Sequence, residues 1–75
     1  MRYRIYWGLD RFLDQMIGDP VTLNRKTIDS AFLAACKNPF PGATHFEIWQ
    51  VSGHNEEYER FKMRGETLNF IGRAG

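Results

Sequence analysis

The chain has 75 residues, and its ten basic side chains are balanced by nine acidic ones. This length allows one domain, residues 1–75, and a net charge of +1 indicates no class of partner by itself. The single cysteine excludes an internal disulfide, and no apolar run approaches the roughly 20 residues that cross a membrane. We therefore expect a cytoplasmic protein that does not associate with membranes.

Residues 2–8 are predicted to form a half-buried strand, because aromatic and β-branched side chains recur on alternate positions. Residues 10–18 follow, with apolar side chains at the helical spacings of three and four. Asp10 is a suitable N-cap, and Gly18 is a suitable residue just beyond the C-terminus. We therefore predict a helix of about two turns, which needs tertiary packing because so short a helix is unstable alone.

The clearest helical pattern lies between residues 24 and 38. Apolar residues recur at i, i+3, i+4, i+7 and i+8 from Ile28 to Cys36. Thr27 is favoured as the N-cap, because an earlier start would place two basic residues in the first turn, against the helix dipole. Residues 21–23, between the two predicted helices, are expected to form a short extended connector.

The C-terminal half predicts strands. Residues 44–52 carry large apolar side chains on both faces, which is typical of a central strand. Residues 56–64 fit either a helix or a strand, and we favour a strand at 58–64 because alternation accounts for more of the side chains. A turn at Gly65 is then expected to lead into a last strand at residues 67–71.

These elements predict an α+β domain with the order β-α-α-β-β-β, in which two helices pack on one face of a small, mostly antiparallel sheet. The tail, residues 72–75, is expected to be frayed. Buried aromatic rings should supply most of the core. We predict that the core contains Phe12, Phe32, Phe46, Phe61, Phe70 and one of the two tryptophans.

Candidate catalytic and metal-binding residues are few. Cys36, His45 and His54 are separated by nine residues each, which does not match the compact spacing of zinc ligands. Cys36 lies on the apolar side of its predicted helix and is interpreted as a small buried hydrophobe. Glu47 shares a strand with Trp49, but no position is evident for the second carboxylate that hydrolysis requires. We predict no metal site and no cofactor.

One group of side chains forms a candidate binding surface. If strands 2–8 and 58–64 share a sheet, their basic and aromatic residues face the same way. The predicted partner-binding residues are Arg2, Arg4, Tyr6, Trp49, Tyr58, Arg60, Lys62 and Arg64. Arginine and tyrosine are typical of protein-binding hot spots, whereas arginines among aromatics also suit nucleic acids. A third interpretation is a solvated face, on which Glu47, Glu57 or Glu59 balance the basic side chains.

The leading hypothesis is a non-enzymatic protein-interaction module, a small regulator or inhibitor of bacterial or phage type. It would bind a larger protein complex through the exposed sheet face, with Trp7 or Trp49 as anchor. It depends on the aromatic content, since six Phe, three Tyr and two Trp exceed what so small a core needs.

Two alternatives remain open. A nucleic-acid-binding protein would use the same basic, aromatic face. A small enzyme would place its site near Glu47, His45 and Cys36, and would need to oligomerise because so short a chain has little room for a pocket. The sequence is compatible with a monomer or a homodimer.

Overall fold

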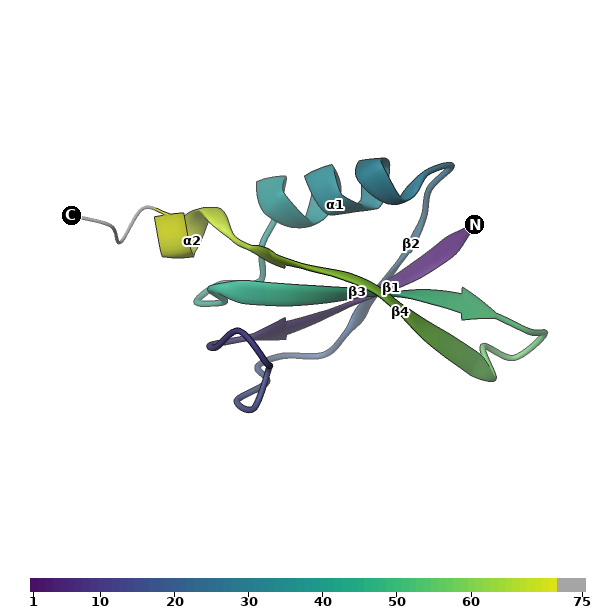
Figure 1. Cartoon of the computed structure of the whole chain (residues 1–75), viewed down its shortest axis with the longest axis horizontal. Coiled ribbons are helices and arrows are strands. Elements are labelled where there is room, and N and C mark those ends of the chain that lie inside the picture. The colour runs from purple at the N-terminus through teal and green to yellow at the C-terminus, as the bar shows by residue number, and fades with distance from the viewer. Residues whose placement is uncertain (72–75) are drawn as a thin grey trace.

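The computed structural model describes residues 1–71 and shows a four-stranded sheet with a helix along one face (Figure 1). The elements are β1 (Arg2–Gly8), β2 (Val21–Asn24), α1 (Ile28–Lys37), β3 (His45–Ser52), β4 (Tyr58–Glu66) and α2 (Leu68–Ile71). The strand order is β2-β1-β3-β4, and each neighbouring pair is antiparallel. The predicted α+β class and antiparallel sheet are confirmed. The order is instead β-β-α-β-β, and one helix rather than two packs on the sheet.

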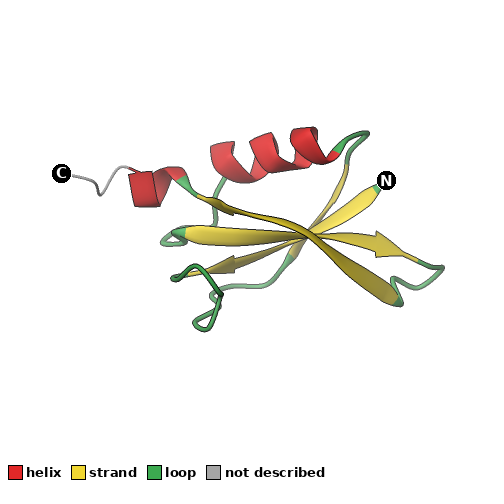
Figure 2. Ribbon diagram, in the orientation of Figure 1, coloured by secondary structure: helices red, strands yellow, loops and turns green. Residues whose placement is uncertain are grey.

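Helix α1 begins and ends where the sequence indicates. The Thr27 hydroxyl accepts a hydrogen bond from the Ser30 backbone N–H at 3.2 Å and caps the N-terminus. Ala31 and Ala35 are fully buried, and small side chains at these positions let the helix approach the sheet closely. Figure 2 shows this helix lying along one side of the strands. Neither described helix is long and apolar enough to cross a membrane.

The core lies between α1 and the sheet. Its largest members are Tyr3, Ile5, Trp7, Phe46 and Ile48, each at most 3% exposed. Among the predicted core residues, Phe46 and Trp7 are therefore buried, and Phe32 is half-buried. Phe12 and Phe61 are wrong as core residues, since they are 61% and 37% exposed. The side chain of Phe70 lies outside the described residues, as does the predicted frayed tail at 72–75.

The predicted helix at residues 10–18 is wrong, because this segment is an irregular loop between β1 and β2. The Ile17 backbone N–H donates to the Trp7 carbonyl at 3.0 Å, which ties the end of the loop back to β1. Leu13 is the buried anchor of the loop and adopts a left-handed φ of 54°. Two helical turns would be marginally stable alone, and these backbone bonds to β1 offer a competing arrangement.

Two further predictions need correction. Residues 21–23 are not a connector, because Val21–Asn24 pairs with β1 as strand β2. The predicted turn at Gly65 and the last strand at 67–71 are also wrong, since β4 continues to Glu66 and residues 68–71 form α2. Gly65 lies within the strand, where a glycine is needed because the Phe46 and Phe32 rings fill the space that a Cβ would occupy.

Candidate functional site

The side of the sheet opposite α1, which we call the open face, is defined by the strand register. Cross-strand partners lie on the same face of a sheet. Arg4 is paired with Trp49, and Trp49 is paired in turn with Phe61. By the same pairing, the central part of the open face includes Arg2, Arg4, Tyr6, Glu47, Trp49, Val51, Glu59, Phe61 and Arg64, with Thr22 and Asn24 on β2 and His45 and Glu66 at one end.

A bulge in β4 divides the predicted binding residues between the two faces. Ile48 pairs with Met63 whereas the next residue pairs with Phe61, so Lys62 is an extra residue on β4. The extra residue reverses the alternation of β4 beyond it. The structure therefore brings together Arg2, Arg4, Tyr6, Trp49 and Arg64. Arg60 and Tyr58, opposite Gln50 and Ser52, belong to the other face.

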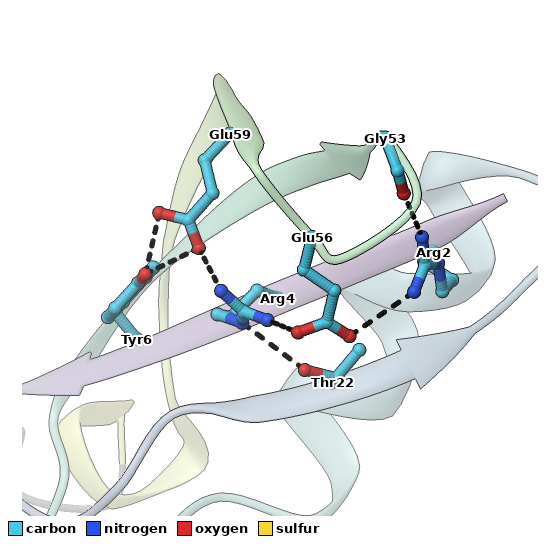
Figure 3. A network of polar contacts seen from close by, with 7 residues as sticks. All are labelled: Arg2, Arg4, Tyr6, Thr22, Gly53, Glu56 and Glu59. Carbon is cyan, nitrogen blue, oxygen red and sulfur yellow. Dashed lines mark hydrogen bonds and ion pairs between the residues drawn. The ribbon is translucent and has the colours of Figure 1, made fainter.

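Carboxylates pair with the arginines of β1 on the open face (Figure 3). Arg4 forms ion pairs with Glu56 and with Glu59, the latter at 2.6 Å. Arg2 pairs with Glu56 at 3.3 Å and donates to the Gly53 carbonyl at 2.9 Å. Glu56 reaches these arginines from the loop between β3 and β4, where it adopts a left-handed φ of 57°.

Arg64, on β4, is also paired. Its Nε donates to Glu47 at 2.9 Å, and Glu47 accepts a second hydrogen bond from the Trp49 indole N–H at 3.2 Å. The sequence predicted that Glu47, Glu57 or Glu59 would pair with the basic side chains. Glu47 and Glu59 do so, and Glu56 rather than Glu57 forms the remaining ion pairs. The arginines of this face are thus neutralised from within the molecule.

These contacts shift two ionisation equilibria. Burial raises the pKa of the Tyr6 phenol, and its hydrogen bond to Glu59, at 2.6 Å, raises it further because ionised Tyr6 would repel that carboxylate. Burial alone would lower the pKa of the Arg4 guanidinium, but hydrogen bonds and the charges of Glu59 and Glu56 raise it overall. Tyr6 therefore keeps its proton, and Arg4 keeps its charge, over the whole physiological range.

An unbroken row of rings and guanidinium groups crosses the open face, and we call it the aromatic row. Tyr6 meets Trp49 edge to face at 6.3 Å between ring centres, and Trp49 meets Phe61 at 5.6 Å. The Arg64 guanidinium lies 4.7 Å from the Phe61 ring centre and 5.4 Å from that of Phe12. The row therefore joins three strands to the loop between β1 and β2.

That loop supplies exposed apolar side chains that the sequence analysis did not assign to a site. Phe12 is 61% exposed and Met16 is 53% exposed. The helical interpretation placed both on a buried stripe, which concealed their exposure. The high aromatic content was the available signal, since it indicated more rings than the core could bury.

Two hollows flank the aromatic row. The smaller, of about 170 Å³, which we call the Trp49 hollow, lies between the loop and the sheet. It is lined by Tyr6, Leu13, Met16, Glu47, Trp49 and Glu59. The larger, of about 470 Å³, lies beside β4 and is lined by Arg11, His45, Phe61, Met63, Arg64, Gly65 and Glu66.

Of the residues proposed for an enzyme site, His45 and Glu47 both lie on the open face, whereas Cys36 lies on α1, on the other side of the sheet. The Cys36 side chain packs from α1 against the core, and burial raises the pKa of its thiol. His45 pairs with Glu66 and lies in register with the open face, on the other side of the sheet from α1. Its Nδ1 lies 2.9 Å from the Thr44 hydroxyl. Within residues 1–71, no three His, Cys, Asp or Glu side chains gather as metal ligands would.

Trp7 and Trp49, the two candidate anchors, differ in exposure. Trp7 is 3% exposed and packs against Phe46, so it offers no surface to a partner. Trp49 is half-buried and lines the Trp49 hollow. Of the two, only Trp49 can serve as an anchor.

No protein-family model, curated protein or solved structure matches this chain. The case for a functional site therefore rests on the geometry of the open face alone.

Proposed function

We propose that this domain is a non-enzymatic protein-interaction module that binds a protein partner through the aromatic row and the adjoining loop. The observation that supports it is the pairing of the arginines on the open face. Since Arg2, Arg4 and Arg64 are already bound by carboxylates, what the face offers a partner is chiefly apolar and aromatic surface. Rings and arginines in partly desolvated positions are typical of hot spots in protein interfaces.

Nucleic-acid binding is the less favoured alternative. Affinity for a phosphate backbone comes from cationic groups that exchange counterions for phosphates. Arginines that already hold carboxylates release fewer counterions and bring negative charge close to the backbone. Arg60 and Lys62 are exposed on β4, but Arg60 belongs to the face opposite the paired arginines and Lys62 is the bulge residue, so they do not extend a cationic surface with them. Under the favoured proposal, the domain regulates or inhibits the larger protein complex that it binds.

The test compares proteins captured from the native cell extract by the wild type and by two matched variants. Phe12→Ser changes an exposed ring of the aromatic row, and Leu33→Ser changes a side chain of α1 that is 56% exposed. We expect a protein that the wild type and Leu33→Ser retain and Phe12→Ser loses. Equal capture by all three would contradict the proposal. Retention of single-stranded DNA or RNA at about 50 mM salt would instead support nucleic-acid binding.

A further inference from the structure

The Trp49 hollow has the dimensions of a site for one side chain. Its volume of about 170 Å³ is below the roughly 300 Å³ at which pockets for whole small molecules begin. Leu13 and Met16 contribute an apolar wall from the loop, and Tyr6 and Trp49 contribute rings from the sheet. Leu13 is only 7% exposed, so its part of the loop wall is held in place by the fold, whereas Met16 is 53% exposed and can adjust to an occupant.

The charged groups of the wall are carboxylates. Glu47 and Glu59 line the hollow, and the described residues of the wall include no lysine, arginine or histidine. Arg64 and Arg4, which pair with these two acids, lie outside the wall. A carboxylate has about four acceptor positions. Glu47 already accepts from Trp49 and Arg64, and Glu59 already accepts from Arg4 and Tyr6. Each carboxylate therefore keeps acceptor capacity for an additional donor from an occupant.

The rings of the wall favour the same sign of charge. The face of an indole or phenol ring carries negative electrostatic potential and attracts cations, most strongly for tryptophan. An anionic occupant would meet two carboxylates, whereas a cation placed over the face of either ring would be attracted. A neutral apolar occupant would gain contact with Leu13 and Met16 but nothing from the acids.

We propose that the Trp49 hollow receives a basic side chain, lysine or arginine, from the partner protein. The alkyl stem packs against Leu13, Met16 and Trp49, and the charged end lies beside Glu47 and Glu59. A long basic side chain suits this arrangement because its stem is apolar and its tip is charged. This inference rests on the proposed function, since it names the chemistry by which the aromatic row selects its partner.

Three probes of equal chain length test the charge preference directly: pentylammonium, 1-pentanol and pentanoate. The readout is the NMR resonance of the Trp49 indole N–H, which donates to Glu47 at 3.2 Å. The Trp7 indole N–H, buried on the other face, is the internal reference. We expect pentylammonium to shift the Trp49 signal and to bind about fivefold or more tightly than 1-pentanol, with pentanoate weakest. Equal or stronger binding of 1-pentanol or pentanoate overturns the proposal.

Matched charge variants provide the second measurement. Glu59→Gln removes a charge from the wall, whereas Glu57→Gln removes the same charge from an exposed position outside it. We expect pentylammonium affinity to fall at least about threefold in Glu59→Gln and to stay unchanged in Glu57→Gln. Equal effects of the two variants overturn the proposal, and the three-probe comparison on the wild type decides it if Glu59→Gln does not fold.

The two proposals can fail separately. If Phe12→Ser loses a captured protein but the Trp49 hollow shows no preference for pentylammonium, the basic-side-chain inference is wrong and the protein-interaction function stands. If the hollow prefers pentylammonium but no captured protein depends on Phe12, the protein-interaction function is wrong, and with it the assignment of the cation to a partner protein.

Discussion

Gly65→Ala is expected to destabilise the protein, although the same substitution at an ordinary strand position would stabilise it. A Cβ at Gly65 would lie 2.4 Å from Cζ of Phe46 and 2.8 Å from Cε2 of Phe32. Both rings belong to the packed layer between α1 and the sheet, and Phe46 is fully buried. An added methyl group must therefore displace aromatic rings rather than the flexible end of a surface side chain.

Two effects of opposite sign set the magnitude. Replacing glycine by alanine within a strand contributes about 0.5–1 kcal/mol of stability through chain entropy. Overpacking a close-packed core costs about 1–3 kcal/mol. The middles of the two ranges leave a net loss of roughly 1 kcal/mol. For a domain of this size, each 1 kcal/mol lowers the melting temperature by about 4–8 °C.

Urea unfolding followed by tryptophan fluorescence measures the loss. Glu66→Ala is the matched control, because Glu66 is the next residue on β4 and is exposed. Its free energy of unfolding should stay within about 0.5 kcal/mol of the wild type. A Gly65→Ala protein as stable as the wild type, or more stable, would refute the packing of both rings over Gly65 and leave only the effect of chain entropy.

Two other substitutions test the helix cap and the Tyr6 contact. Thr27→Ala removes the hydroxyl that caps α1 and should lower the free energy of unfolding in urea by about 1 kcal/mol. Ser52→Ala, at the exposed end of β3, is the control and should lower it less. Equal losses in the two variants would count against the cap. The pKa of Tyr6 in the folded protein is raised above its ordinary 10.0, so the unfolded chain loses the phenol proton first as pH rises. The stability that the protonated Tyr6 contributes below pH 10.0 is therefore lost as pH rises through the folded pKa. Tyr6→Phe should therefore lose less stability above pH 10.0 than the wild type, and parallel alkaline profiles would disprove this contribution.

The sequence predicted the elements whose own residues all indicate the same secondary structure. Helix α1 could be predicted because its apolar period, its Thr27 cap and its alanines all indicate the same structure. Strand β1 could be predicted from alternation, because Tyr3, Ile5 and Trp7 are all buried on one side. Strand β3 could be predicted from its large apolar side chains on both faces, which suit its central place in the sheet. The loop at residues 10–18 could not, because its helical spacing competes with backbone bonds to β1 that connect distant positions.

The candidate site was predicted in part for a related reason. The residues on β1 and β3 were assigned to the right face because regular alternation holds along both strands. The assignments on β4 were divided by the bulge at Lys62, and a one-residue insertion leaves no signature in the composition of a single strand. The role of Glu56 was also hidden, since it depends on how the loop between β3 and β4 folds back over β1.

The bulge at Lys62 has a consequence for solubility. β4 forms one border of the sheet, and the backbone groups along such a border can recruit a strand from another molecule. Natural sheets limit this association with charged residues, especially lysine, and with irregular pairing that twists the border away. Lys62 is both a charged residue and the irregular, bulged position of the border strand. The same extra residue that distributes β4 side chains between two faces thus also discourages growth of the sheet at this border.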